Sequence, residues 1–249
     1  MPSAPWPQGV DRVVLPEVDS TSAEAARRAL ATPTWIMAHR QTAGRGRRGR
    51  AWAMPEGNFA ASLVWRPGGD PAAMALRSFV AALALRDALV SLGVAGLTLK
   101  WPNDVLLDDG KLAGILLESP APGLLVLGVG VNLIAVPEAT SLEPGAVPPI
   151  SLLSASGLRV EPAVMLDALA PAFAARDAQF LTWGFAPIRT AWLDHAARLG
   201  RGITVRLPGE TLTGIFRDLD TDGCLVLETG HGLRRIAAGD VFFGEPQCS

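Results

Sequence analysis

The pattern of apolar and turn-forming residues changes near Gly200 in this 249-residue chain. Before Gly200, apolar stretches of helical length alternate with short apolar runs. After it, only short strand-like runs remain, at Ile203–Leu207, Leu212–Asp218, Cys224–Glu228 and Gly232–Ile236. The turn signals between these runs are Pro208-Gly209, Asp222-Gly223 and Gly230. We therefore predict two domains, residues 1–200 with helices and a sheet, and residues 201–249 with a small β-barrel.

The first 200 residues predict strands and helices that alternate too irregularly for a series of βαβ units, so the predicted fold class is α+β. Strands are predicted at Val13–Leu15, Trp35–His39, Asn58–Trp65, Leu97–Trp101, Val105–Leu107, Leu112–Glu118 and Leu124–Ile134. Helices are predicted at Ser22–Ala31, Pro71–Leu92, Pro162–Leu181 and Pro187–Arg198, with a Pro-rich connection at Ala135–Pro149. Asp108-Asp109-Gly110 predicts a hairpin, and Thr21 with Glu24 has the spacing of a capping box.

Composition argues against several classes of protein. A hydrophobic content of 49% and a formal net charge of -2 are typical of a globular protein, not of a disordered chain or a generally basic nucleic-acid binder. Two cysteines, Cys224 and Cys248, are too few for a disulfide framework and favour a reducing, cytoplasmic setting. Met1–Gln8 lacks the apolar run of a secretory signal, and the long apolar stretch Ala72–Leu92 carries Arg77 and other charges. We therefore predict no membrane span.

Lysine is scarce in a chain that otherwise uses arginine. Lys100 and Lys111 are the only lysines among 22 basic residues. A coding bias accounts for the scarcity, but it makes the two exceptions informative, because a compact ammonium fits sites that a planar guanidinium does not. Asp104 could form an ordinary salt bridge with either lysine. The functional alternative is that Lys111 binds a carboxylate or phosphoryl oxygen and stabilises its charge in a transition state.

The segment Gln41–Arg50, which we call the arginine loop, is too rich in glycine and arginine for a regular helix or strand. Its glycines match the dinucleotide-binding fingerprint, but the residues that follow are a poor start for the helix that this motif requires. A Walker A motif also fails, because Arg50 and Ala51 stand where lysine and a hydroxyl are needed. We interpret the segment as a structured loop whose guanidiniums bind a polyanion. An RNA-binding segment and a solvated charged loop are the alternatives.

Asparagine is also rare, occurring only at Asn58, Asn103 and Asn132. Asn132 ends the apolar run that begins at Gly128. Its amide could cap the end of a strand or contact a base or phosphate, and the residues alone do not separate these two interpretations.

Five segments, in their order and spacing, resemble the motif set of biotin protein ligases. They are Asp19–Ser22, Gln41–Trp52, Lys100–Val105, Lys111–Glu118 and Gly128–Asn132. The resemblance implies that residues 1–200 form a catalytic domain related to class II aminoacyl-tRNA synthetases and that residues 201–249 form an SH3-like β-barrel. It also implies two reactions. Biotin and Mg-ATP give biotinyl-5′-AMP and pyrophosphate, and an acceptor lysine then displaces AMP.

The resemblance further implies which residues form the site. Biotin-binding residues are expected at Ser20, Thr21, Ser22, Gln41, Gly44, Arg45, Gly46, Arg47, Lys111 and Gly114. ATP-binding residues are expected at Arg47, Arg48, Gly49, Trp52, Asn103, Asp104 and Asn132. Catalytic roles are expected for Lys111, Arg48, Asp104 and Lys100, and no metal-ligating side chain is expected. Trp52 would offer a flat face to adenine, and the arginine loop would order over the reactive adenylate and exclude water.

Two features of the sequence depart from the family that it resembles. Ser22 stands where the family usually has asparagine, and the 18 residues before Asp19 are too few for the helix-turn-helix of some members, so no DNA binding is expected. The expected partner is the biotin carboxyl carrier domain of a biotin-dependent carboxylase, and the sequence also allows a homodimer. The alternatives are a lipoate or octanoate ligase or transferase of the same fold and, from another class, an RNA-binding module that uses the arginine loop.

Overall fold

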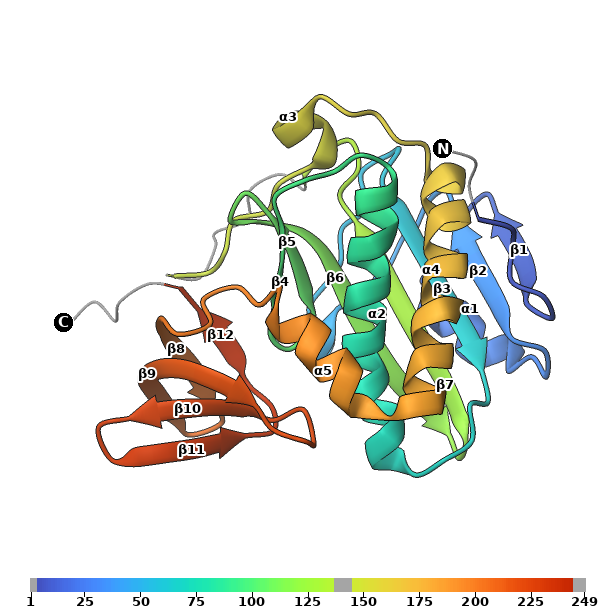
Figure 1. Cartoon of the computed structure of the whole chain (residues 1–249). Helices are drawn as coiled ribbons and strands as arrows, with labels where there is room; N and C mark the ends of the chain where they lie inside the picture. The colour runs from blue at the N-terminus through green and yellow to red at the C-terminus, as the bar shows by residue number, and fades with distance from the viewer. Residues whose placement is uncertain (1–3, 137–144, 244–249) are drawn as a thin grey trace.

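A seven-stranded sheet runs through the centre of the molecule (Figure 1). The computed structural model describes residues 4–136 and 145–243. Across the sheet the order is β1 (Asp11–Leu15), β2 (Thr34–Ala38), β3 (Phe59–Trp65), β7 (Leu124–Val131), β6 (Gly110–Ala121), β5 (Asp104–Leu107) and β4 (Leu97–Lys100). Cys248 and part of the predicted connection Ala135–Pro149 lie outside the described residues.

The sheet is mostly antiparallel. Only β1 and β2 run parallel, and the other neighbouring pairs are antiparallel. The strands β2, β3 and β7 are buried along their whole length, as expected for nearly continuous apolar runs in a sheet covered on both faces. All seven strands predicted before Gly200 are present, and the separate helices and largely antiparallel sheet confirm the α+β class.

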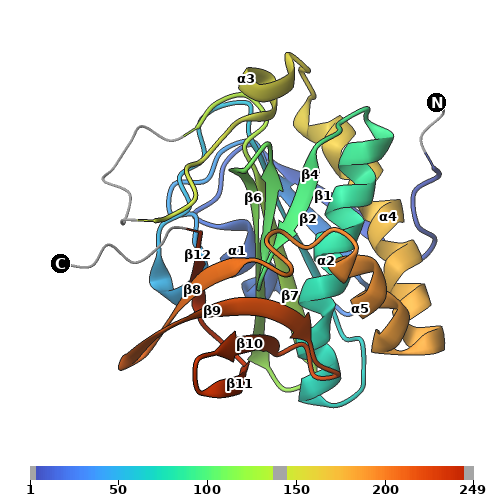
Figure 2. The ribbon, with the colours of Figure 1, turned by 60° about the vertical axis from the view of Figure 1, so that its left-hand side comes forward.

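Two long helices, α2 (Pro71–Ser91) and α4 (Pro162–Trp183), cover one face of the sheet (Figures 1 and 2). Each begins with a proline in its first turn, where the missing N–H has no partner in the helix to lose. Asp70 caps α2 by accepting a hydrogen bond from the Ala73 N–H at 2.7 Å. Both helices were predicted, and their ends agree with the prediction to within two residues.

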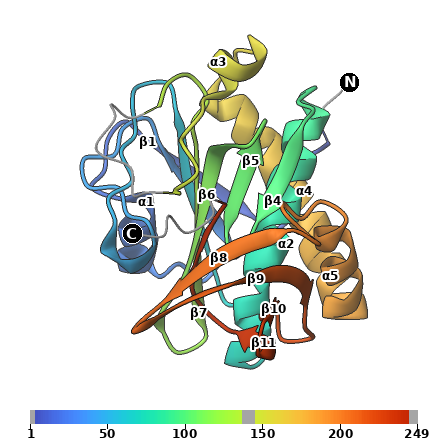
Figure 3. The same cartoon turned by 90° about the vertical axis from the view of Figure 1, so that its left-hand side faces the viewer.

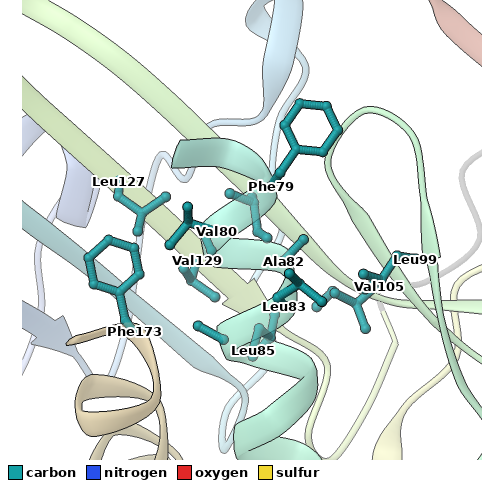
Figure 4. Packing of buried hydrophobic residues seen from close by; sticks show 14 of the residues in the cluster. Phe79, Val80, Ala82, Leu83, Leu85, Leu99, Val105, Leu127, Val129 and Phe173 are labelled. Atoms are coloured by element: carbon teal, nitrogen blue, oxygen red, sulfur yellow. The ribbon is translucent and has the colours of Figure 1, made fainter. Parts of the chain in front are cut away.

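The main hydrophobic core lies between these helices and the sheet. Figure 4 shows Val80 of α2 close to Leu127 and Val129 of β7, with Phe173 of α4 on the same side of the sheet. Full burial of one such side chain contributes roughly 1.5–3 kcal/mol. The core therefore gives β6 and β7 a rigid support, and the opposite face of these strands is free to carry a site.

The opposite face of the sheet carries α1 (Thr21–Arg28) (Figure 3). Ser20 is the N-cap of α1, and its hydroxyl accepts from the Ala23 N–H at 3.4 Å. The predicted capping box of Thr21 and Glu24 was wrong, because Thr21 is already the first residue of the helix and Glu24 forms ion pairs within it. The helix also ends earlier than predicted, where the backbone turns left-handed.

The strands β5 and β6 are joined by the hairpin that Asp108-Asp109-Gly110 predicted. Leu107 pairs with Gly110, so the loop consists of Asp108 and Asp109, whose φ angles are 47° and 63°. Both positions of a type I′ turn need positive φ, which aspartate tolerates better than most residues. The turn places Lys111 directly after it on β6.

A second sheet of five strands forms the C-terminal part of the chain (Figure 1). Its order is β11 (Gly232–Ile236), β10 (Leu225–Thr229), β9 (Glu210–Leu219), β8 (Gly202–Leu207) and β12 (Asp240–Phe242). Four of these strands were predicted, and β12 was not. Trp101, just after β4, donates its indole N–H to the Gly223 carbonyl oxygen at 3.1 Å, which connects the second sheet to the first.

Short helical segments complete the described chain. The helix α5 (Phe185–Leu193) contacts α2 and the strand β9 of the second sheet, and it is shorter than predicted. The helix α3 (Leu152–Ser156), capped by Ser151, was not predicted. The arginine loop contains one 3-10 turn, η1 (Arg47–Gly49). Within residues 4–136 and 145–243, no helix combines the length and apolar character needed to cross a membrane.

Candidate functional site

A cavity of about 780 Å³ lies on the α1 side of the large sheet. The strands β6 and β7 contribute its floor, and the arginine loop and β12 of the second sheet contribute its sides. Polar and glycine residues of the lining are Ser20, Thr21, Ser22, Gln41, Arg45, Gly46, Arg47, Arg50, Lys100, Asn103, Asp104, Lys111, Gly114, Gly128, Gly130, Asn132 and Asp240. Ligand cavities are typically about 300–1,000 Å³, so this one can hold a ligand of nucleotide size.

Uncharged polar groups gather at the start of α1. The backbone N–H of Thr21 donates to Gln41 Oε1 at 2.8 Å, and the Thr21 hydroxyl donates to the same oxygen at 3.1 Å. Ser62 Oγ, on β3, lies 2.9 Å from Thr21 Oγ1 and 3.0 Å from Ser22 Oγ. We call these four residues the hydroxyl–amide cluster. Its three hydroxyl residues are buried, so a neutral polar ligand group placed here would need matched donors and acceptors.

A charged group lies where β4, β5 and β6 meet. Lys111 Nζ is 2.8 Å from Asp104 Oδ1, and Lys100 Nζ is 3.5 Å from Asp104 Oδ2. Lys100 and Asp104 are each 8% exposed, whereas Lys111 is only half-buried. Both salt bridges considered from the sequence are therefore present, and they share one carboxylate. We call these three residues the lysine–aspartate triad.

Electrostatics within the triad favour an added anion. Burial alone would raise the pKa of Asp104, but the ammonium groups of Lys111 and Lys100 outweigh it, so the pKa of Asp104 falls below its usual value. Burial lowers the pKa of Lys100, and Asp104 offsets only part of that effect. Because one carboxylate serves two ammonium groups, the half-buried Lys111 can take a second anionic partner from the cavity.

The arginine loop is held against the second sheet by Asp240. Arg48 Nη1 and Arg50 Nη2 lie 2.8 and 2.7 Å from Asp240 Oδ2. Arg47 reaches further inward and donates to Asn103 Oδ1 at 3.3 Å. Burial lowers the pKa of the Arg47 guanidinium, so this side chain has already lost part of its water shell. Among the loop arginines, Arg48 and Arg50 are therefore ion-paired to Asp240, while Arg45, Arg47 and Arg50 line the cavity.

Trp52 packs against two glycines of the cavity floor. A Cβ added at Gly130 would lie 2.4 Å from Trp52 Cε2, and a Cβ at Gly114 would lie 3.1 Å from Trp52 Cζ3. Lys111 Nζ is 5.9 Å from the centre of the indole ring. The two glycines therefore allow the half-buried indole to approach β6 and β7, and its surface in the cavity lining is suited to stacking against a flat ligand.

Both asparagines of the cavity also support the backbone. Asn103 Nδ2 donates to the Ile115 carbonyl oxygen, and Asn132 Nδ2 donates to the Lys111 carbonyl oxygen at 3.4 Å. Asn132 therefore bonds the backbone of the neighbouring strand β6, and the capping of its own strand stays a prediction. Because it also lines the cavity, contact between Asn132 and a ligand stays a prediction.

All but three of the residues predicted for the site line the cavity, and the exceptions are Gly44, Arg48 and Gly49. Gly44 has a structural role here, since its carbonyl oxygen accepts from the Trp52 N–H at 2.8 Å and a Cβ would lie 2.4 Å from the Trp52 carbonyl oxygen. Arg48 turns toward Asp240. The ligand contacts of all the predicted site residues, whether or not they line the cavity, stay predictions.

Sequence reasoning missed Ser62 and Asp240. Ser62 is a lone hydroxyl in the apolar strand β3, and that interruption was a usable signal because buried polar groups need partners. Asp240 gave no signal, because its contact with the arginine loop exists only when the second sheet packs beside the first.

Comparisons with known proteins decide the family. Residues 15–132 match the model described as "Biotin/lipoate A/B protein ligase family", and residues 199–244 match "Biotin protein ligase C terminal domain". The chain is 52% identical to the biotin–[acetyl-CoA-carboxylase] ligase of Paracoccus denitrificans, over 93% of this chain and 100% of that protein. The chain belongs to the biotin protein ligase family.

Two further relatives agree with this result. A biotin protein ligase from Aquifex aeolicus, solved in complex with biotin and ATP, matches with a TM-score of 0.82 at 26% identity, over 93% of this chain and 97% of that one. The biotin–[acetyl-CoA-carboxylase] ligase of Mycobacterium tuberculosis is 33% identical over 92% of this chain and 87% of that protein. These matches favour a biotin ligase over a lipoate or octanoate enzyme, and they confirm the predicted fold of a catalytic domain followed by the C-terminal domain of the family.

The acidic groups of the cavity lining bear on whether side chains of this biotin protein ligase could hold a metal. In the part of the chain that the structure describes, no three His, Cys, Asp or Glu side chains are grouped for metal binding. The two acidic side chains of the cavity lining, Asp104 and Asp240, are already paired with lysine or arginine. The described residues of the lining therefore group no three side chains that would form a metal cage.

Proposed function

We propose that this biotin protein ligase activates biotin with Mg-ATP to biotinyl-5′-AMP and transfers biotin to one lysine of a biotin carboxyl carrier domain. The observation that carries the proposal is the order of groups along β7 and at Asn132, the residue that follows it. Ser22 of the hydroxyl–amide cluster lies over Gly128, Trp52 lies over Gly130, and Asn132 bonds the backbone of Lys111. Alternate residues of a strand share a face at intervals of roughly 6.6 Å, so one extended ligand can contact all three positions.

The hydroxyl–amide cluster suits the ureido ring of biotin. This ring is neutral and carries both N–H donors and a carbonyl acceptor, so its burial requires matched polar partners. Ser20, Thr21, Ser22 and Gln41 supply hydroxyl and amide groups in the cavity lining. Gly44, Arg45 and Gly46 then belong to the part of the arginine loop that lies over the bound vitamin.

The first reaction joins two anions. A carboxylate oxygen of biotin attacks the α-phosphorus of ATP, the new C–O–P bond forms, and the bond to the β-phosphate breaks to release pyrophosphate. Lys111 neutralises the carboxylate and the α-phosphate where they approach, and Arg47 neutralises the phosphate oxygens, with Arg48 and Gly49 nearby in the loop. The chemistry needs positioning and charge neutralisation, and no nucleophilic side chain takes part.

The second reaction transfers biotin to the acceptor. The amine of the acceptor lysine attacks the acyl carbon, the new C–N bond forms, and the C–O bond to phosphate breaks, so AMP leaves and the proton of the amine passes to solvent water. The carboxylate of Asp104, which Lys111 and Lys100 hold in place, orients the amine by electrostatic attraction. Lys100 holds Asp104 in place from the buried side.

Magnesium enters the proposal with the nucleotide. Because the described residues group no three acidic or imidazole ligands, Mg²⁺ would be held mainly by phosphate oxygens and water, as is common for Mg-ATP sites. When bound, it supplies charge neutralisation on the phosphates. Trp52, Asn103 and Asn132 are proposed to contact the nucleoside part of ATP.

The proposal also covers the partner, the assembly and the location of the protein. The Paracoccus denitrificans relative is named for acetyl-CoA carboxylase, which favours the carrier domain of a biotin-dependent carboxylase as the acceptor. A homodimer and a cytoplasmic location stay predictions from the sequence.

The test of this function measures both reactions with purified protein. Pyrophosphate release should require biotin and Mg-ATP together, and labelled biotin should then appear on the lysine of an added carrier domain. Lipoate and octanoate serve as competing substrates. Turnover with lipoate that equals turnover with biotin, or pyrophosphate release that is independent of biotin, would refute the proposal.

A further inference from the structure

Ser62 belongs to the hydroxyl–amide cluster, yet no step of the proposed function uses it. It is fully buried on β3 beside Gly128 of β7, and it does not line the cavity. Its hydroxyl nevertheless bonds the hydroxyls of Thr21 and Ser22, which both line the cavity. Ser62 therefore touches no ligand directly and can act only through these two residues.

The donor and the acceptor of each hydrogen bond in the cluster can be assigned, starting from the backbone N–H of Thr21. A backbone N–H can only donate, so the Gln41 atom that faces the Thr21 N–H at 2.8 Å is the oxygen Oε1. This fixes the orientation of the amide and turns Nε2 toward Gly44. Because Gln41 Oε1 can only accept, the Thr21 hydroxyl donates to it at 3.1 Å.

The same reasoning passes to the two serines. The Thr21 hydroxyl has used its single hydrogen, so Ser62 donates to Thr21 Oγ1 at 2.9 Å. Ser62 has then used its own hydrogen, so Ser22 donates to Ser62 Oγ at 3.0 Å. The hydrogen of Ser22 is thereby directed away from the cavity, and its lone pairs are the groups left for a ligand.

We infer that Ser62 is a positioning residue that sets the hydrogen-bond polarity of Ser22 and makes Ser22 Oγ an acceptor, beside the Gln41 Nε2 donor that the Thr21 N–H orients. The inference rests on the proposed function, because this polarity matches a ureido group, whose oxygen accepts and whose N–H groups donate. Ser22 needs such control. A hydroxyl rotates, so its hydrogen and lone pairs have no fixed direction unless a neighbour sets them.

Gly128 makes the arrangement sterically feasible. A Cβ added at Gly128 would lie 2.5 Å from Ser22 Oγ and 3.5 Å from Ser62 Oγ. The absence of a side chain at this position leaves the space in which the Ser22 hydroxyl reaches Ser62. The missing side chain at Gly128 of β7 is therefore required for the hydrogen bond between Ser22 and Ser62.

The test uses ligands whose polarity is changed at one atom. Biotin has two cyclic carbamate analogues, in each of which one ureido N–H is replaced by oxygen. In one of them the ring oxygen lies at Ser22 Oγ, so two hydrogen-bond acceptors face each other and no hydrogen bond forms. Calorimetry on the wild type should show that one carbamate binds about 100-fold more weakly than biotin. In Ser62→Ala, biotin should bind about fivefold more weakly, and the preference over that carbamate should fall to about tenfold or less, because Ser22 can now donate.

Three controls separate this effect from general damage. Ser119→Ala removes an exposed serine hydroxyl on β6, outside the cavity lining, and should leave the affinities for biotin and for the carbamate unchanged. Ser62→Thr keeps the hydroxyl and should restore the preference. Ser62→Cys has nearly the shape of serine and a weaker donor, so it gives the same test if Ser62→Ala fails to fold. ATP affinity should stay within about twofold in all variants.

The outcomes are separable from those of the proposed function. An unchanged carbamate preference in Ser62→Ala, or a loss of ATP affinity that parallels the loss for biotin, would overturn the inference. Binding needs no turnover, so a wild type that binds biotin without releasing pyrophosphate would refute the proposed function and still permit this test. A wild type that does not bind biotin overturns both.

Discussion

The hydroxyl–amide cluster and the lysine–aspartate triad line the same cavity but bind polar groups in opposite ways. The cluster is uncharged, and each of its hydroxyl hydrogens is already committed to a neighbour. The triad is charged, and its two ammonium groups share one carboxylate. The cluster is therefore selective for hydrogen-bond geometry, whereas the triad attracts negative charge with little geometric demand.

This difference matches the two tasks that the proposed reaction sets. A neutral vitamin ring is recognised by pairing every donor and acceptor, because an unpaired buried group costs about 1–3 kcal/mol. Two anions that must approach each other need a positive field that is already in place. Substitutions in the triad should therefore change turnover strongly, and substitutions in the cluster should change affinity modestly.

The largest effect is expected from Lys111→Ala. It removes the half-buried ammonium that faces the cavity, so biotin-dependent pyrophosphate release should fall by about 10²–10³-fold. Lys111→Arg is the matched control, because it keeps the charge but replaces a compact ammonium with a planar group and should lose less. Near-normal turnover of Lys111→Ala would show that the lysine–aspartate triad does not supply the charge neutralisation that distinguishes it from the hydroxyl–amide cluster.

The next largest effect is expected from Asp104→Asn. This change leaves the buried Lys100 without its counter-charge, so the free energy of unfolding should fall by about 3 kcal/mol at neutral pH. Urea unfolding of variant and wild type gives the difference. Equal free energies of unfolding would show that the Asp104 carboxylate does not stabilise the buried charge of Lys100.

The pH dependence of that difference follows from the lowered pKa of Asp104. The carboxylate stabilises the fold fully above its unfolded pKa of about 3.9, and the contribution is lost as pH falls through the lower folded pKa. The stability gap between wild type and Asp104→Asn should therefore be constant near neutral pH and shrink below about pH 4. A gap that widens on acidification would contradict the assignment.

An intermediate effect is expected from Gly130→Ala, at a position between the hydroxyl–amide cluster and the lysine–aspartate triad. The added Cβ would lie 2.4 Å from Trp52 Cε2, so the indole must move, and the KM for ATP should rise about tenfold. Gly202→Ala is the control, because its Cβ meets no atom within 4 Å. A rise in the KM for biotin alone would place Trp52 at the other end of the cavity.

The smallest effect is expected from Asp240→Asn, which loosens the arginine loop. Ion pairs of exposed side chains such as Arg48 and Arg50 contribute less than about 1 kcal/mol each, so the KM values should rise less than about fivefold. The difference from wild type should diminish in high salt, which screens such pairs. Glu210→Gln, which breaks an exposed ion pair elsewhere in the second sheet, should have no effect on KM.

The sequence predicted those parts of the fold that local physics controls. The helix from Pro71, the Asp108-Asp109 hairpin and the change to short strands after Gly200 each depend on a nearby periodicity or turn signal. The helix α3 and the strand β12 were missed, because five and three residues are too short to show a period. Their formation depends on tertiary packing.

The same division applies to the site. Gln41 and Lys111 stood out by residue type and motif, and both line the cavity. Ser62 was missed although it interrupts an apolar strand, because its importance depends on which side chains of α1 lie opposite it. Asp240 was missed because it lies far from the arginine loop in the sequence. The two meet only when the second sheet packs beside the first.

The central claim is that one extended ligand lies with its neutral ring at the hydroxyl–amide cluster and its phosphate at Lys111. The most direct measurement is a crystal structure with a non-hydrolysable analogue of biotinyl-5′-AMP. We predict the ureido group within hydrogen-bond distance of Gln41 Nε2 and Ser22 Oγ, the phosphate-like link beside Lys111 Nζ, and the adenine against Trp52. An analogue bound in the reverse direction, or outside this cavity, would contradict the account.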